Sequence, residues 1–400
     1  MSEVFVSGLG VVSPHGDDAE ALFAALLRGE SAVRPIFPEL ARPAAAAAVS
    51  FDETRWFNKL QLAGVDRVSQ MAVAAASLAL DDAGGLGGTD PERVGVYVGC
   101  GMGGANALDL AYRSGGRVPP LTIPAYMPNA PAAHVALRHG VKGPVLTYSV
   151  ACASSSVAIA EAAKAVRNGE VDVAIAGGSE ALLVPGVMMA WQAMMTLASF
   201  APGEAATACR PFASDRSGFV LGEGAAFMVL ESAERARARS ARTYAQLAGW
   251  GLSCDASHLT KPDVSGQQRA LKTALRTAGL QASDVGYCNA HGTATKVGDS
   301  VEAEALRGVW GPAIEQLQVS STKALHGHLL GAAGALEAVA TVLALRHRQL
   351  PPNANCANPD SALGLRLVSP ASSSTPELRA AMSSSFAFGG TNSVLLFTSD

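Results

Sequence analysis

Helix-like and strand-like hydrophobic patterns alternate along this chain. In the first half, an amphipathic run at 66–84 precedes the continuously apolar segment 94–99, and a second apolar segment at 145–149 leads into a helical run at 154–169. Continuously apolar strands that alternate with helices are typical of parallel sheets covered on both faces. The pattern therefore predicts an α/β fold.

The same order of elements recurs in the second half. A helical run at 266–279 precedes the strand 285–290, and the strand 317–321 leads into a long helical run at 328–349. We therefore predict a duplicated α/β chain, since similar spacing appears twice.

The two predicted halves span residues 1–243 and 244–400. They join near the basic run 234–243, whose charges predict a solvated helix face rather than a polyanion site. A chain of 400 residues is longer than one hydrophobic core usually serves. The formal charge of -4 gives no reason to expect nucleic acid as a partner.

One uncharged stretch, 181–201, is long enough to span a bilayer. Pro185 and Gly186 interrupt it early, Gln192 interrupts it again, and no Lys or Arg flanks it. We therefore predict a buried helix there and no membrane contact. Six cysteines without a CxxC pair, behind an N-terminus with no leader pattern, indicate a reduced, cytoplasmic protein.

Cys152 lies in the run YSVACASSSVAIAEA, where a predicted strand passes into a predicted helix and every neighbour is small. A thiol at a helix start meets unpaired N–H groups, which favour the thiolate. The other interpretation is a buried packing cysteine, which is common for this residue type. His291 and His328 lie at the matching junctions of the second half, and this supports a reactive thiol.

Several competing motifs are weaker. Gly99, Gly101 and Gly104 spell GxGxxG after a strand, but no acidic residue ends a second strand about 20 residues later, so we expect a tight glycine loop near the active site. Asp299 and Glu302 begin a predicted helix, where ordinary helix capping is the favoured interpretation over an acid pair. The spacing of His326 and His328 could suggest zinc, but no cysteine is nearby, so we expect no metal.

Four ordered motifs resemble the signatures of β-ketoacyl-[acyl carrier protein] synthases, most of all the elongating ketosynthases of fatty acid and type II polyketide synthesis. The motifs are SVACASSS, NAHGTATKVGDSVEAEAL, SSTKALHGHLLGAAGALE and SSSFAFGGTNSVLLF. The resemblance covers nearly the whole chain. It implies the thiolase-like fold, a duplicated αβαβα sandwich whose first half holds the nucleophile and whose second half holds the two histidines.

The resemblance also implies a function: decarboxylative Claisen condensation of an acyl group on Cys152 with malonyl-[acyl carrier protein]. His291 and His328 would stabilise the enolate, and the backbone of Phe388 would contribute to an oxyanion hole. Lys323 and Glu337 would fix charge and water near the histidines. The alternative is a catalytically weak subunit of the chain-length-factor kind, but such a subunit lacks the nucleophile. Fatty acid, polyketide and polyene pathways stay open.

The remaining expectations concern substrate and partners. Expected substrate-binding residues are Met102, Met188, Phe386, Gly389, Thr293 and Thr295. No cofactor is expected, because the substrates arrive on the phosphopantetheine of an acyl carrier protein. The resemblance implies a homodimer, or a heterodimer with a related subunit. An acidic carrier needs a basic surface patch, and the candidates are Arg55, Lys59 and Arg67, or Arg138 and Lys142.

Overall fold

In the computed structural model, the strands of both halves form one long mixed sheet that is nearly divided at its centre. The structure describes residues 2–369, 374–375 and 377–399. The first wing contains β1 (Val4–Val12), β8 (Gly224–Ser232), β6 (Val173–Glu180), β4 (Val94–Gly99) and β5 (Val145–Tyr148). The second wing contains β9 (Ala245–Cys254), β14 (Thr391–Thr398), β13 (Ala380–Phe386), β10 (Tyr287–Asn289), β11 (Gln318–Ser320) and β12 (Arg366–Leu367). The wings meet where β1 pairs with β9 at only two positions, Phe5 with Gln246 and Val6 with Ala245.

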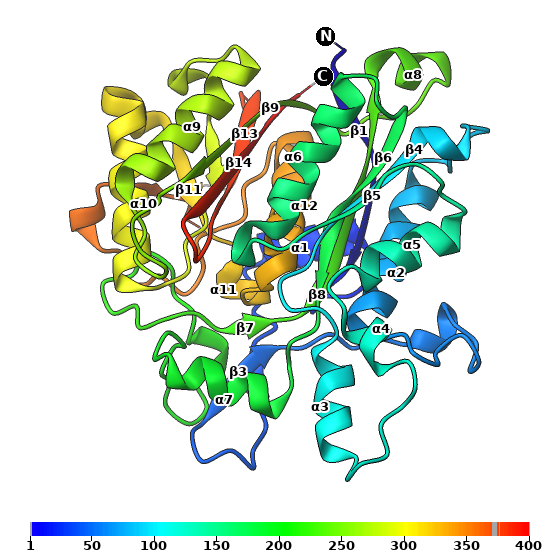
Figure 1. The fold of residues 1–400 in the computed structure, drawn as a ribbon. Helices are drawn as coiled ribbons and strands as arrows, with labels where there is room; N and C mark the ends of the chain where they lie inside the picture. Colours follow the sequence, from blue (N-terminus) through cyan, green and yellow to red (C-terminus); the bar gives the residue numbers. More distant parts are fainter. Residues whose placement is uncertain (1, 370–373, 376, 400) are drawn as a thin grey trace.

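Helices cover both wings and fill the space between them (Figure 1). The central layer holds α6 (Ser154–Arg167) and α12 (Ala333–His347), which contact each other and both wings. Outside the first wing lie α2 (Arg67–Asp82) and α5 (Ala130–His139); outside the second lie α9 (Val264–Ala278) and α10 (Lys296–Trp310). This is the predicted αβαβα sandwich. The exact division at residue 243 stays a prediction.

The remaining elements are shorter. They are α1 (Ala19–Leu27), α3 (Ala105–Arg113), α4 (Thr122–Tyr126), α7 (Pro185–Ala193), α8 (Ala233–Ala238) and α11 (Lys323–His326). A small sheet of β2 (Arg34–Ile36), β3 (Ala44–Ala47) and β7 (Leu221–Gly222) lies at the end of the molecule where α7 is found (Figure 1).

The parallel strands predicted from the sequence are present in both wings. Strands β4, β5 and β6 are parallel to one another, and so are β10, β11 and β13. The antiparallel centre, which is formed by β1, β8, β9 and β14, was not predicted. The segment that leaves β5 leads into α6, and the segment that leaves β11 leads through residues 321–332 into α12, so both reach the central layer (Figure 1).

Two predicted helices differ from the structure. The predicted helix 328–349 begins only at Ala333, because His328 forms an extended bridge to Leu221 and its backbone N–H donates to Val220 O over 2.7 Å. The predicted buried helix within 181–201 is the short helix α7, of which only Met188 is buried. Pro185 starts this helix, as its fixed φ angle favours. Met195, two residues after the helix ends at Ala193, is 84% exposed.

Within the described residues, the stretch with the length and hydropathy of a membrane span is Leu330–His347, which includes α12. It is 89% buried inside the protein. Side chains of both wings and of α6 surround it, so it is the central core helix.

Candidate active site

Cys152 lies at the junction between β5 and α6, on a single 3₁₀ turn formed by Ala151–Ala153. Ala151 has a φ of 49°, a strained value for a residue with a Cβ, and this brings the thiol into the interior cavity. Gly99 packs directly beneath: a Cβ there would lie 2.1 Å from the backbone N of Ser155. The GxGxxG segment is therefore a close-packing loop beside the thiol, as predicted.

The prediction that the helix start favours the thiolate of Cys152 is wrong for the protein without substrate. Burial raises the pKa of the thiol to about 12, although Lys323 and a hydrogen bond from the Phe388 backbone both lower it. Removal of the thiol from water therefore outweighs the helix N-terminus. The nucleophile rests as a neutral thiol.

His291 follows β10, and Glu302 of α10 holds its loop. One carboxylate oxygen of Glu302 accepts the N–H of His291 and the other accepts the N–H of Gly292, both over 2.8 Å. Helix capping was predicted for Glu302, but Thr295 is the residue whose side chain caps α10. Asp299 also differs from that prediction, because its carboxylate accepts the N–H of Phe212 over 2.7 Å. Burial raises the pKa of both carboxyl groups to about 7.

His328 lies between Phe219 and His291. Its ring meets each of them edge to face, with centroids 5.4 Å and 5.5 Å apart. The backbone N–H of Leu330 donates to Nδ1 of His328 over 3.3 Å, so Nδ1 is the acceptor and the proton of the neutral ring lies on Nε2. Burial, with Lys323 as the next cause, holds the pKa of both histidines well below the usual value. Both rings are therefore neutral at pH 7.

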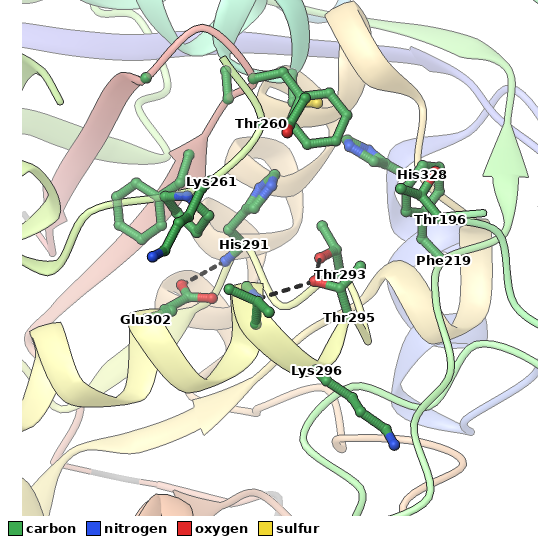
Figure 2. A pocket seen from close by; sticks show the side chains of 18 of the residues that line it. Thr196, Phe219, Thr260, Lys261, His291, Thr293, Thr295, Lys296, Glu302 and His328 are labelled. Carbon is green, nitrogen blue, oxygen red and sulfur yellow. Dashed lines mark hydrogen bonds between the residues drawn. The ribbon is translucent and has the colours of Figure 1, made fainter. Parts of the chain in front are cut away.

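Cys152, His291 and His328 converge from three separate elements. One ligand-type atom of each, sulfur or ring nitrogen, lies within 4.8 Å of the other two. They line a cavity of about 390 Å³, and Figure 2 shows the rings of His291 and His328 within it. Such a trio has the composition of a zinc site. However, a metal would need the Nε2 lone pair of His328, and the bond from Leu330 places a proton there.

The loop after β13 covers the thiol. Phe388 stacks on Trp191 of α7, with ring centroids 6.2 Å apart, and Trp191 meets Phe219 edge to face at 5.5 Å. Gly389 and Gly390 have φ angles of 87° and 81°, which favour glycine. These turns bring the backbone N–H of Phe388 to the sulfur of Cys152.

Lys323 and Glu337 form an ion pair behind the histidines, with Nζ and Oε1 2.5 Å apart and both side chains fully buried. Burial raises the pKa of Glu337 to about 7 despite the nearby ammonium group. Lys323 also lowers the pKa of His291 and His328. The pair therefore acts on the site through charge.

The other predicted catalytic and substrate-binding residues differ in whether they line the cavity. Phe386, Thr293 and Thr295 line the cavity together with Phe388. Met188 lies behind this wall, buried in an apolar cluster with Cys152. Met102, Gly389, Lys323 and Glu337 are not among the described residues that line the cavity. A role for Met102, which is 40% exposed, stays a prediction.

The structure adds cavity residues that sequence reasoning missed. Trp191 and Phe219 contribute aromatic rings to the cavity lining. Lys261, from the loop after β9, and Lys296, from the start of α10, also line the cavity and are exposed to solvent, so we place them at its entrance; Figure 2 labels both. Lys296 directly follows the HGTAT motif, so its position in the sequence could have indicated that it lies near His291. Nothing in the sequence relates Trp191 or Lys261 to Cys152.

Most side chains of the two predicted basic patches already have partners within the protein, which limits their use in docking a carrier protein. Arg67 pairs with Glu223 over 2.7 Å, and Arg55 pairs with Asp17. Arg138 donates to Trp56 O. The backbone N–H of Lys142 donates to Pro91 O, three residues before β4 begins at Val94, whereas Cys152 follows the opposite ends of the parallel strands β4 and β5. Of the first patch, Lys59 stays a candidate.

Comparison with known proteins gives a consistent result. Residues 1–236 match the family model for the N-terminal domain of beta-ketoacyl synthases, and residues 244–357 match the model for the C-terminal domain. The chain is 41% identical to nodulation protein E of Rhizobium meliloti and 37% identical to 3-oxoacyl-[acyl-carrier-protein] synthase 2 of Vibrio cholerae, with 98% of each protein covered.

Solved structures agree. The ishigamide ketosynthase/chain length factor superposes with a TM-score of 0.91 at 32% identity, over 100% of this chain and 99% of that one. A type II polyketide ketosynthase, solved in complex with its acyl-carrier protein, gives a TM-score of 0.92 at 28% identity over the whole of both chains.

Proposed function

The chain belongs to the β-ketoacyl synthase family, and from this premise we propose that it joins an acyl group held on Cys152 to malonyl-[acyl carrier protein] with loss of CO₂. It is an acyltransferase of the ketosynthase type. The observation that supports this assignment of residues is the convergence of Cys152, His291 and His328 within 4.8 Å in one buried cavity.

The first step transfers the acyl group. The sulfur of Cys152 attacks the carrier thioester, the carbon–sulfur bond to the carrier breaks, and the thiol proton leaves with the carrier thiol. The thioester oxygen becomes negative in the transition state. The N–H of Phe388, which already points at the sulfur, lies where it can donate to that oxygen together with the N–H of Cys152.

The second step releases CO₂ from the malonyl group and leaves the electron pair as an enolate. Nε2–H of His328 and one ring nitrogen of His291 would donate to the enolate oxygen. Neutral histidines suit this role, since they donate without first losing a proton. One such donor contributes about 3 kcal/mol to the transition state. Burial, and after it the charge of Lys323, lowers the pKa of both rings and keeps them neutral.

The third step forms the new carbon–carbon bond. The enolate carbon attacks the acyl carbon on Cys152, the bond to sulfur breaks, and the released thiolate takes a proton from solvent. Aromatic rings of Trp191, Phe219, Phe386 and Phe388 surround the reacting atoms, and this limits water in the cavity.

The proposal includes the partners. Lys261 and Lys296 at the entrance suit an acidic carrier protein whose phosphopantetheine enters the cavity. Strand β5 is an edge of the first wing, and its Val145 and Leu146 are 38% and 45% exposed, which suits pairing with a second copy or a related subunit. A cytoplasmic location is supported by six free cysteines.

Reconstitution tests the function. The purified chain should convert an acyl-loaded carrier and malonyl-loaded carrier to the β-ketoacyl product, with a transient acyl adduct on the Cys152 peptide by mass spectrometry. An adduct confined to another cysteine would refute the assignment. If the chain is active only when it is mixed with a related subunit, the heterodimer is the working enzyme.

A further inference from the structure

Glu180 ends β6 in the interior, fully buried, and its carboxylate joins two loops of the site. Oε2 accepts the N–H of Gly101 over 2.8 Å and the N–H of Gly331 over 2.9 Å. Oε1 accepts the N–H of Met102 over 3.2 Å. Gly101 and Met102 follow β4 of the first half, whereas Gly331 belongs to the turn after His328 in the second half. The carboxylate therefore connects the two halves beside the cavity.

The turn that Glu180 holds is strained. Leu330 has a φ of 44°, which costs about 1–3 kcal/mol for a residue with a side chain, and neighbouring contacts must maintain it. In this conformation the N–H of Leu330 points at Nδ1 of His328, and the next N–H, that of Gly331, points at Glu180. These two bonds hold consecutive peptide groups of one turn.

We infer that Glu180 is a positioning residue for His328: it holds the Leu330–Gly331 turn so that the Leu330 N–H keeps the imidazole proton on Nε2, where it faces the cavity. The inference rests on the proposed function, in which Nε2–H of His328 donates to the enolate oxygen. Nε2 of His328 is buried and has no partner within the described residues, as expected for a donor that awaits the enolate.

A carboxylate is required because three backbone N–H donors face its two oxygens, and the thiol of Cys100 is a further donor 4.0 Å from Oε1. Glutamine would place an NH₂ group against at least one backbone N–H, so one or more of the three bonds would be lost. The space is also fixed: a Cβ at Gly101 would lie 2.6 Å from Oε2, and one at Gly331 would lie 2.5 Å from it. A side chain at either glycine would therefore displace the Glu180 carboxylate from its three backbone donors.

The test compares Glu180→Gln with the wild-type chain by three measurements: the rate of malonyl-carrier decarboxylation, the rate of Cys152 acylation and the ¹⁵N spectrum of the histidines. Decarboxylation of malonyl-carrier needs His328, whereas acylation of Cys152 does not. Misplacement of one reacting group costs roughly 10–100-fold in rate, so decarboxylation should fall by that factor while acylation changes far less. In ¹⁵N spectra of histidine-labelled protein, the His328 nitrogens, assigned with His328→Ala, should lose the pure Nε2–H pattern.

The control is Glu231→Gln. Glu231 is a buried carboxylate on β8 that pairs with Arg239, and it lies opposite Val173 on β6, whereas Glu180 lies at the other end, opposite Gly224. This variant should lose stability, but its ratio of decarboxylation rate to acylation rate and its His328 spectrum should match those of the wild-type chain. If Glu180→Gln does not fold, Glu180→Asp retains the charge but is too short for all three bonds, and the same readouts apply.

Equal losses of both steps in the Glu180 variants, or an unchanged His328 tautomer, would overturn the inference. If instead the wild-type chain neither decarboxylates malonyl-carrier nor acylates Cys152, the proposed function fails. The tautomer of His328 in the variants then still decides whether Glu180 positions the ring.

Discussion

The backbone N–H of Phe388 donates a hydrogen bond to the thiol of Cys152 in the resting protein. The two residues are 236 positions apart and lie in different halves, so this bond forms only when the halves are assembled. It places one oxyanion donor beside the nucleophile before any substrate arrives. Donors that are fixed in advance need no reorganisation in the transition state.

Cys152→Ala should abolish acyl transfer and condensation and keep the fold, because small residues surround the site. The free energy of unfolding should change by about 1 kcal/mol. Decarboxylation of malonyl-carrier should persist, since the histidine donors remain. Intact mass spectrometry follows acylation, and CO₂ release follows decarboxylation. Acylation that survives in the variant would show that another residue is the nucleophile.

The raised pKa of Cys152 predicts the pH dependence of its alkylation. A thiol with a pKa of about 12 is protonated at pH 7, and its thiolate fraction rises tenfold with each pH unit up to about that value. The rate of iodoacetamide labelling at Cys152 should therefore rise log-linearly from pH 7 to 10. Free cysteine, with a pKa of about 8.5, levels off within this range.

A plateau for Cys152 below pH 9 would contradict this prediction. It would mean that a thiolate–imidazolium pair forms in solution, in which case the two histidines would not be neutral donors at rest.

His291→Ala and His328→Ala should each lower malonyl decarboxylation by roughly 10²–10³-fold, the value of one oxyanion donor. Acylation of Cys152 should fall less, since the Phe388 donor remains. His139→Ala is the matched control, because His139 bonds to Ser77 on the outer helix layer. Wild-type decarboxylation in either active-site variant would make that histidine structural.

Sequence reasoning identified the elements and the three converging residues, because each stands at a strand end that the hydrophobic pattern locates. It could not predict the charge states of the buried side chains or the contacts of the buried carboxylates. The charge state of Cys152 depends on burial by residues from both halves, and the role of Glu302 depends on how the His291 loop folds back over α10. These effects arise from contacts between distant segments.

Glu180 illustrates the same limit. In the sequence it closes an apolar strand in GGSE, next to two glycines, and nothing nearby suggests a partner. Its partners are 78 to 151 positions away. Likewise, the apolar run 181–201 suggested burial by composition, yet Met188 is the one buried residue of α7, and the helix supplies Trp191 to the cavity wall.

Lys261 and Lys296 should recognise the carrier protein. Both are exposed and line the entrance, so the double variant Lys261→Glu/Lys296→Glu should weaken use of carrier-bound substrates by roughly 2–10-fold at low salt. Small thioesters without a carrier should react as before. Higher salt should shrink the difference, since exposed charges are screened. Lys142→Glu, at the opposite end of the strands, should change neither rate. An equal loss with small thioesters would assign the lysines to the cavity rather than to docking.

Met188 should limit the space for the acyl chain. It is fully buried in the cluster that contains Cys152, so Met188→Ala opens room beside the bound acyl group. Such a truncation costs about 2–5 kcal/mol in unfolding free energy. Competition between short and long acyl-carrier substrates should shift toward the longer chain. Met71→Ala, equally buried in the α2 core away from the thiol, should lose similar stability without that shift. An unchanged preference in Met188→Ala would make Met188 a core residue only.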